Sequence, residues 1–175
     1  MDVGCGAGTW LSVFSSFGKN IEGYDFGSGV VNEAVIPSSL IKIADLTKPL
    51  DFGRRYDLAL NLEVAEHLEE SSADVLVQSL SCARDMLLFS AAIPRQGGTH
   101  HVNCQWPSYW AKKFAAFGFV AFDILRPIFW LNSSICPWYR QNMILYIRNP
   151  GNNVTQKLAS MTSFNCLPLV HPEMR

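Results

Sequence analysis

The chain has 175 residues, of which 49% are hydrophobic and 17% charged, so it is long enough for one globular domain with a sizeable buried core. Its net charge of -1 and isoelectric point near 6.4 argue against a broad basic surface that binds nucleic acid nonspecifically. No apolar run is long enough to span a membrane, and five cysteines without a C-x-x-C pair predict reduced thiols in the cytoplasm.

The first residues predict a strand that ends in a glycine-rich turn and continues into a helix. Residues 2–9 read Asp-Val-Gly-Cys-Gly-Ala-Gly-Thr. Because glycine lacks a Cβ, a turn built from Gly4, Gly6 and Gly8 bends tightly and lets a ligand approach the backbone. A dinucleotide-binding turn would have its third glycine at Thr9, which disfavours an NAD-linked oxidoreductase. The observed spacing favours S-adenosylmethionine.

Three further strands are predicted, and each ends at or beside an acidic residue. Parallel strands end at a common edge of their sheet, so we expect these carboxylates near the glycine turn. Asp25 is expected to accept hydrogen bonds from ribose hydroxyls, and Asp45 to accept one from an adenine amino group. The strands and their acidic residues are 21–25 with Asp25, 41–46 with Asp45, and 56–63 with Glu63.

The remaining predicted elements alternate between helix and strand, a pattern typical of an α/β sheet with helices on both faces. The predicted helices span residues 9–17 and 28–35, a segment after Ser72 that includes Ala83, and a segment from Pro107 that ends at Gly118. The predicted strands span residues 86–91, 119–125 and 141–148. Residues 149–175 predict a loosely structured tail with one short helix near residues 154–161.

Several segments carry a resemblance to a known family. Residues 2–8 resemble the first motif of class I S-adenosylmethionine-dependent methyltransferases, and residues 61–68, Asn-Leu-Glu-Val-Ala-Glu-His-Leu, resemble the motif at their fourth strand. With the closing strand near residues 142–148, the resemblance covers residues 1–148. It implies a Rossmann-like, mostly parallel sheet with an antiparallel last strand in a domain of residues 1–148, followed by a C-terminal tail of residues 149–175.

The resemblance also implies a cofactor, S-adenosylmethionine, and its demethylated product, S-adenosylhomocysteine. It assigns the cofactor to the glycine turn, the acidic strand ends and the residues beside them. Asp2 is expected to organise the turn and the methionine amino group of the cofactor. The implied cofactor-binding residues are Asp2, Gly4, Cys5, Gly6, Gly8, Asp25, Phe26, Asp45, Leu46, Asn61, Leu62 and Glu63.

The start of the chain departs from the family pattern. The first strand of the family usually has several apolar residues before its acidic position, whereas Asp2 here follows Met1 directly. We therefore expect an N-terminally clipped central strand, no lid over the cofactor, and a partner chain or second copy that covers the site. This departure also supports an alternative hypothesis, a noncatalytic or truncated subunit that binds cofactor and supports a partner.

Ionisable residues gather where the methyl acceptor is expected. Residues 63–67 read Glu-x-x-Glu-His, and His100 and His101 follow the fifth strand. One hypothesis makes His67, His100 or His101 the group that takes the acceptor proton. The alternative is a divalent metal held by Glu63, Glu66, His67 and His101, as in the ubiquinone-biosynthesis and small-RNA 2′-O-methyltransferases that this segment resembles. A third interpretation is that Glu-His merely starts the next helix.

The second half of the chain is rich in aromatic residues. Tyr109, Trp110, Phe114 and Phe117 follow helical spacing, which predicts a face packed on the sheet. The loop residues Trp106, Trp130 and Tyr139 are instead predicted to form a platform for a sugar ring or other flat acceptor. Residues 97–103, 105–110 and 138–142 also resemble an uncharacterised bacterial subgroup of the family. We therefore expect O-methylation of a small molecule such as a sugar or polysaccharide precursor.

Overall fold

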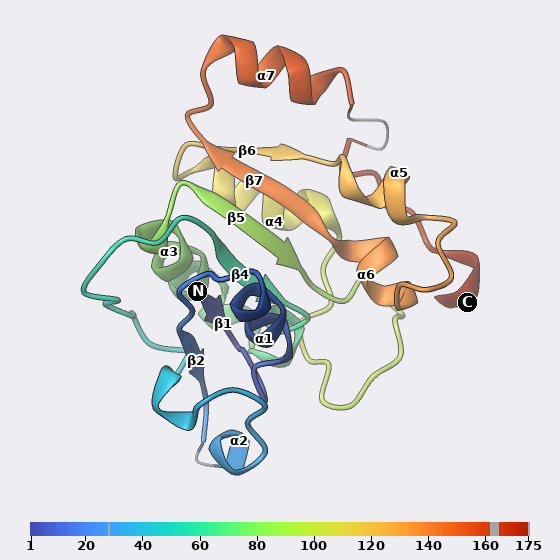
Figure 1. Cartoon of the computed structure of the whole chain (residues 1–175). Helices are drawn as coiled ribbons and strands as arrows, with labels where there is room; N and C mark the ends of the chain where they lie inside the picture. The colour runs from blue at the N-terminus through green and yellow to red at the C-terminus, as the bar shows by residue number, and fades with distance from the viewer. Residues whose placement is uncertain (28, 162–164, 175) are drawn as a thin grey trace.

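A seven-stranded sheet in the order β3-β2-β1-β4-β5-β7-β6 forms the centre of the protein (Figure 1). The computed structural model describes residues 1–27, 29–161 and 165–174. Strands β1 to β5 pair in parallel, whereas β7 is antiparallel to both β5 and β6, as the sequence predicts for the last strand. The strands are β1 Asp2–Val3, β2 Gly23–Asp25, β3 Ile41–Ile43, β4 Ala59–Leu62, β5 Met86–Ser90, β6 Phe119–Phe122 and β7 Ile144–Arg148.

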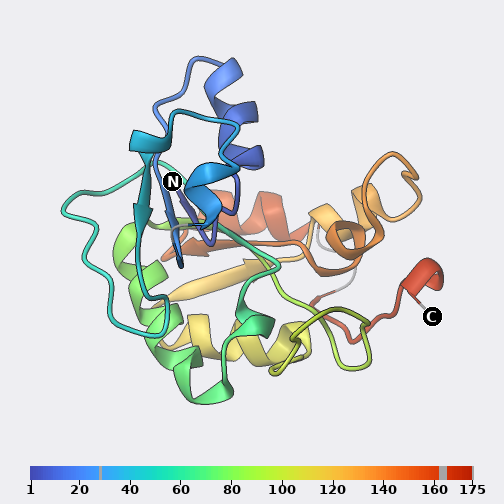
Figure 2. The same cartoon turned by 90° about the horizontal axis from the view of Figure 1, so that it is seen from below.

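Helices cover both faces of this sheet, which confirms the predicted fold class (Figure 2). Helices α3 and α4 lie against one face, and α1, α5 and α6 lie against the other. The α-helices are α1 Thr9–Ser16, α2 Gly29–Asn32, α3 Ala73–Ala83, α4 Pro107–Ala115, α5 Leu125–Phe129, α6 Pro137–Asn142 and α7 Asn152–Ala159. Short 3-10 turns are η1 Ser38–Leu40, η2 Ala65–His67, η3 Glu70–Ser72 and η4 Pro172–Met174.

An aromatic cluster joins α4 to the sheet. The ring of Phe89 on β5 lies 5.1 Å from that of Trp110 and 5.2 Å from that of Phe114, and all three side chains are buried. Tyr146 on β7 lies 4.6 Å from Phe114, also centroid to centroid. The predicted apolar face of this helix is therefore correct for Trp110 and Phe114, whereas Phe117 follows the end of α4 and is 38% exposed.

The structure corrects several predicted boundaries. Helices α5 and α6 were not expected, because five- and six-residue helices give too short a periodic pattern. Gln141 and Asn142, predicted in the last strand, lie in α6, and Leu125, predicted at the end of a strand, begins α5. The predicted helix 28–35 is confined to α2, and its first residue, Ser28, lies outside the described residues.

The predicted loose tail contains both a helix and a docked segment. Helix α7 spans Asn152–Ala159, close to the short helix expected there. Residues 165–174 are not loose, because polar contacts tie them to α5 and α6, including a hydrogen bond from the His171 amide to Gln141 Oε1 at 2.7 Å. His171 is only 3% exposed. The helices that the structure describes are all too short or too polar to cross a bilayer.

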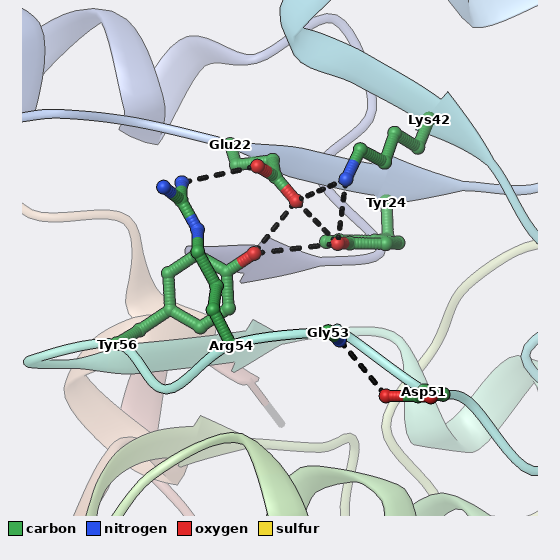
Figure 3. A network of polar contacts seen from close by, with 7 residues as sticks. All are labelled: Glu22, Tyr24, Lys42, Asp51, Gly53, Arg54 and Tyr56. Carbon is green, nitrogen blue, oxygen red and sulfur yellow. Dashed lines mark hydrogen bonds and ion pairs between the residues drawn. The ribbon is translucent and has the colours of Figure 1, made fainter.

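The largely buried carboxylate of Glu22, just before β2, links β2, β3 and the loop before β4 (Figure 3). Glu22 Oε1 accepts hydrogen bonds from the hydroxyls of Tyr24 and Tyr56, the latter at 2.6 Å, and pairs with Lys42 Nζ at 2.8 Å. Arg54 Nη2 lies 3.0 Å from Glu22 Oε2. Burial alone raises the pKa of Glu22, but hydrogen bonds from Lys42, Tyr24 and Tyr56 outweigh it and lower the pKa to about 2.

This network predicts a pH-dependent stability. Glu22→Gln should cost about 1–3 kcal/mol in the free energy of unfolding at pH 7, because the amide cannot accept all of these hydrogen bonds. A lowered folded-state pKa stabilises the fold above the ordinary value of 4.5, and this contribution is lost as the pH falls towards about 2. Urea unfolding at pH 7, 4 and 3 should show the difference from wild type shrinking, with exposed Glu33→Gln as control. A pH-independent difference would contradict this.

Candidate functional site

A pocket of about 590 Å³ opens at the carboxyl edge of the sheet, where β1, β2 and β4 end. This is the point where the strand order reverses, with β2 on one side of β1 and β4 on the other. Open α/β sheets bind their ligands in the crevice at such a point. The pocket is lined by Gly4, Gly6, Asp25, Phe26, Asp45, Leu46, Thr47, Glu63, Val64, His67 and Leu68.

The glycine turn forms one wall of this first pocket. Gly4, Gly6 and Gly8 have φ values of 80°, 50° and 84°, in the left-handed region that favours glycine. A Cβ at Gly4 would lie 2.3 Å from Val64 Cγ2, and one at Gly8 would lie 2.8 Å from Ile36 Cδ1. A Cβ at Gly6 would meet no atom within 4 Å. Gly4 and Gly8 are thus required by packing, whereas Gly6 leaves open space in the pocket.

Asp25 fixes the turn at the end of β2. Its Oδ2 accepts a hydrogen bond from the Gly6 amide at 2.6 Å, and its Oδ1 accepts one from the Phe26 amide at 2.7 Å. The Gly4 amide donates to the carbonyl oxygen of Tyr24 at 2.7 Å. Because each carboxylate oxygen has a second lone pair, Asp25 holds the loop and can still accept from a ligand.

Asp45 and Leu46 form the opposite side of the pocket. Asp45 Oδ1 accepts hydrogen bonds from the hydroxyl and the amide of Thr47, at 2.6 and 2.9 Å. These hydrogen bonds lower the pKa of Asp45. Leu46 is 5% exposed, whereas Phe26, on the rim, is 72% exposed. The pocket therefore combines a charged wall with apolar side chains.

Two predicted cofactor residues support the pocket from behind. Asn61 is 1% exposed, and its Nδ2 donates to the carbonyl oxygen of Val3 at 2.7 Å, which ties β4 to β1. Asp2 is 2% exposed, and burial raises the pKa of its carboxyl to about 7, with a smaller contribution from Asp25. Both side chains lie within the sheet beneath the turn.

Two further predicted cofactor residues have core side chains. The Cys5 sulfur lies where Gly23 leaves room, since a Cβ at Gly23 would be 2.6 Å from it. Burial raises the pKa of the Cys5 thiol to about 12. Leu62 packs with Leu60 and Met143 under α1, α5 and α6. Alternation along a strand explains this placement, because neighbouring side chains point to opposite faces.

Glu63 is held in place by amide side chains. It has a φ of 54°, an uncommon conformation for a residue other than glycine. Its Oε1 accepts from Asn142 Nδ2 at 3.1 Å, and its Oε2 accepts from Gln96 Nε2 at 3.1 Å. Gln96 Oε1 in turn accepts from Gln141 Nε2 at 2.9 Å and from Asn142 Nδ2 at 3.0 Å. The carboxylate that lines the pocket is therefore oriented by a buried network.

Glu66, His67 and His101 meet beside the pocket. One potential ligand atom from each lies within 4.8 Å of the others, and the two imidazole rings are 4.9 Å apart. Glu66 is 0% exposed, and neither of its carboxyl oxygens has a hydrogen-bond partner of ordinary geometry among the described residues. Burial and then the charge of Glu63 raise the pKa of Glu66 to about 8.

The loop that follows β5 brings in only one of the paired histidines. The backbone oxygen of Glu66 accepts from the amides of Val102 and Asn103, at 2.8 and 3.0 Å, which fixes this loop against η2. A Cβ at Gly98 would lie 2.1 Å from His101 Cε1, so the glycine leaves space for the ring. His100, with a φ of 57°, is exposed and lies outside the cluster.

The comparisons with known proteins agree with this geometry. A family model described as a methyltransferase domain matches residues 1–120. The chain belongs to the methyltransferase-domain family. No protein with a curated description matches the chain in sequence. The resemblance stated for residues 1–148 is thereby confirmed at the level of the family.

Solved structures share the fold at low sequence identity. The magnesium protoporphyrin IX methyltransferase of Synechocystis PCC 6803, determined with bound S-adenosylhomocysteine, has a TM-score of 0.63 at 18% identity and covers 85% of this chain and 73% of its own. An amino pentose methyltransferase of Micromonospora echinaspora, bound to S-adenosylmethionine, has a TM-score of 0.63 at 14% identity. The match covers 85% of this chain and 82% of that protein. The methyltransferase domain of the bacterial CtHen1-C has a TM-score of 0.60 at 20% identity. The match covers 85% of this chain and 88% of that domain.

The predicted aromatic platform of this methyltransferase-domain protein is divided in the structure. Trp130 packs on His171, with ring centroids 4.7 Å apart, and the Tyr139 hydroxyl accepts a hydrogen bond from Trp10 Nε1 at 3.2 Å. Trp106 alone of the three lines a second pocket, of about 650 Å³. The sequence analysis assigned no role in the site to Gln96 and Gln141. Both are polar side chains that the fold buries, and their positions in the sequence do not reveal that burial.

The glycine geometry of the methyltransferase turn predicts unequal effects of alanine. Gly4→Ala and Gly18→Ala both place alanine at positive φ, at a shared cost of about 1–2 kcal/mol. Only the Cβ at Gly4 collides with Val64, so Gly4→Ala should lose a further 1–3 kcal/mol or so. Urea unfolding monitored by circular dichroism measures the difference. Equal losses in the two variants would contradict the packing role of Gly4.

Proposed function

We propose that this methyltransferase-domain protein transfers a methyl group from S-adenosylmethionine to an oxygen atom of a small molecule. The observation that carries this proposal is that the glycine turn and a pair of histidines lie at the same edge of the sheet. The glycine turn with Asp25 lines a pocket that also includes His67, and His67 lies beside His101. The solved relatives bound to S-adenosylmethionine or S-adenosylhomocysteine support the choice of donor.

The residues of the first pocket fit such a donor. The open space at Gly6 admits a ligand close to the backbone, and Asp25 retains lone pairs for ribose hydroxyls. Asp45 would accept from the adenine amino group, with Leu46 and Phe26 beside the ring. Asp2 and Asn61 would act from beneath, by holding β1 and β4 in position.

The chemistry is a displacement that depends on alignment. When bound, the donor supplies a methyl group on a positively charged sulfur, so a carbon–oxygen bond forms as the carbon–sulfur bond breaks. His67 would take the proton from the acceptor hydroxyl, with His101 holding its ring. Glu63 would position the acceptor through an orientation that Asn142 and Gln96 fix. His100 is not favoured for this role because it lies outside the cluster.

A divalent metal ion is the second candidate for the acceptor side. Its support is the buried carboxyl of Glu66, which has no hydrogen-bond partner of ordinary geometry among the described residues and lies with His67 and His101 within 4.8 Å. A carboxylate and two imidazoles are a donor set that suits several divalent ions. Glu63, the fourth residue of the metal hypothesis, is instead engaged by Asn142 and Gln96.

The acceptor class, the domain limits and the compartment are part of the same proposal. The amino pentose methyltransferase among the structural relatives supports a sugar or polysaccharide precursor as acceptor. Residues 1–148 are proposed as the cofactor-binding domain, since they include the whole sheet. The five cysteines remain free thiols, which supports a reducing compartment such as the cytoplasm.

The cofactor assignment is tested by a matched pair of glycines. Gly6→Ala and Gly18→Ala both put a Cβ in open space at positive φ, so both should lose about 1–2 kcal/mol of stability. Only Gly6 lines the pocket, and its new methyl group should weaken S-adenosylhomocysteine binding roughly tenfold or more, about 1.4 kcal/mol. Isothermal titration calorimetry measures this. Unchanged affinity in folded Gly6→Ala would remove the turn from the cofactor site.

The two acceptor-side candidates differ in how Glu66→Gln changes the response of the protein to divalent ions. The pKa of Glu66 is higher in the folded protein than in the unfolded chain. Its carboxyl therefore lowers the free energy of unfolding by an amount that grows as the pH rises from 4.5 towards about 8. Without a bound ion, Glu66→Gln should therefore become more stable than wild type across this range. With a metal site, Mg²⁺ or Mn²⁺ should raise the melting temperature of wild type but not of Glu66→Gln. Exposed Glu69→Gln is the control; ion-independent melting excludes the metal candidate for those ions.

A further inference from the structure

The second pocket lies next to the first one. Gln96 lines the second pocket, Glu63 lines the first, and Gln96 Nε2 donates to Glu63 Oε2 at 3.1 Å. Gln141 of α6 also lines the second pocket and donates to Gln96 Oε1 at 2.9 Å. The buried amide network is therefore a shared wall, and a ligand in the second pocket would lie beside the proposed site of methyl transfer.

The C-terminal segment 165–174 contributes Val170 and Met174 to the wall of the second pocket. Figure 1 shows this segment, in red, beside α6. At its start, the Cys166 amide donates to Asp123 Oδ2 at 2.8 Å, and Arg126 Nη1 donates to the Leu167 carbonyl oxygen at 3.2 Å. Asp123 and Arg126 are both 0% exposed and pair with each other, so this anchor is built into the core.

The far end of the segment is tied down as firmly. The His171 amide donates to Gln141 Oε1 at 2.7 Å, and His171 Nε2 lies 2.8 Å from the Trp130 carbonyl oxygen. His171 Nδ1 accepts from the Glu173 amide at 3.2 Å, which leaves the ring proton on Nε2 to bond the carbonyl. Arg140 pairs with the Glu173 carboxylate. Val170, between these ties, and Met174, next to the last of them, line the pocket.

The lining has a definite chemical character. Ile93, Trp106, Val170 and Met174 offer an apolar surface with one aromatic ring. Arg95 stands at the same pocket, is exposed, and has no carboxylate within ion-pair distance among the described residues. The amides Gln96 and Gln141 are occupied by each other and by Glu63, Asn142 and His171. Among the described residues of this lining, Arg95 is the one cation that remains for a ligand.

We propose that the second pocket is the acceptor subsite, that residues 165–174 close it, and that it takes a ring with an apolar face and an anionic group, a phosphate or a carboxylate. The ring would pack between Trp106 and the side chains of Val170 and Met174, and Arg95 would bind the anion. This inference rests on the proposed function for its link to methyl transfer. The pocket, its cation and its C-terminal wall do not depend on that link.

The charge requirement is tested with paired probes. The probes are glucose 1-phosphate with glucose, and 4-hydroxybenzoate with phenol, each titrated by calorimetry into protein saturated with S-adenosylhomocysteine. At least one anionic ring should bind more tightly than its neutral partner, and which pair does so distinguishes phosphate from carboxylate. Arg95→Gln should weaken that binding roughly tenfold, whereas Arg95→Lys should retain most of it. Arg84→Gln, which alters an arginine before β5 at the opposite edge, is the control.

The role of the C-terminal wall is tested by filling the pocket. Val170→Trp should abolish binding of the anionic ring, whereas Val154→Trp, which adds the same side chain on exposed α7, should leave it unchanged. S-adenosylhomocysteine affinity and circular dichroism report whether each variant is folded. Met174→Ala, which shortens the same wall without adding bulk, should weaken binding and provides a second readout if Val170→Trp does not fold.

The outcomes separate this inference from the proposed function. If neither anionic ring binds more tightly than its neutral partner, or if Arg95→Gln and both wall variants bind like wild type, the subsite is overturned. Such a result leaves the cofactor assignment standing, because that depends on the Gly6 pair. The opposite result is also distinguishable. If the anionic ring binds in a way that depends on Arg95, the subsite is supported. If Gly6→Ala also binds S-adenosylhomocysteine normally, the cofactor assignment is refuted.

Discussion

The hydrogen bond from the Gly6 amide to Asp25 is the constraint on which the site depends. It closes the turn after β1 onto the end of β2, and the Gly4 amide adds a second bond to the Tyr24 carbonyl oxygen. The turn is thereby fixed above the sheet, and α1 starts from Gly8 in a defined direction. A carboxylate that held only a ligand would leave this loop free to move. Asp25 instead builds the wall of the pocket before any ligand arrives, so less ordering is required on binding.

The side of the first pocket that holds Glu63 is organised by a different kind of interaction, a network of amide side chains. Gln96, Gln141 and Asn142 satisfy one another and hold Glu63, and all three are at least nine-tenths buried. Buried polar groups that are fully satisfied rigidify their surroundings. Glu66, close by, has no hydrogen-bond partner of ordinary geometry in the part of the chain that the structure describes. Glu63 therefore has a fixed orientation, whereas burial and the charge of Glu63 raise the pKa of Glu66. Two neighbouring carboxyl groups therefore have different environments on one short stretch of chain.

Local chemistry explains what the sequence predicts well. The glycine turn, the acidic strand ends and the helix that begins at Pro107 depend on residues close together in the chain, and each was found from its own pattern. The Glu63–Asn142 contact joins residues 79 positions apart and exists only because β7 pairs with β5. The choice between His100 and His101 depends on the space above Gly98, which no periodicity reveals. Long-range pairing and steric fit thus set the limit of the sequence prediction.

The C-terminal segment is held through its main chain and through the side chains of His171 and Glu173. The Cys166 and His171 amides and the Leu167 carbonyl oxygen make anchoring hydrogen bonds to side chains of α5, α6 and the turn before α5. Any residue except proline supplies an amide, so positions of this segment other than 171 and 173 can change without loss of these contacts. Substitutions at residues 170 and 174 would change the shape of the second pocket with little loss of folding stability. If the second pocket is the acceptor subsite proposed above, such substitutions would change which molecules are accepted while the scaffold and the first pocket stay the same.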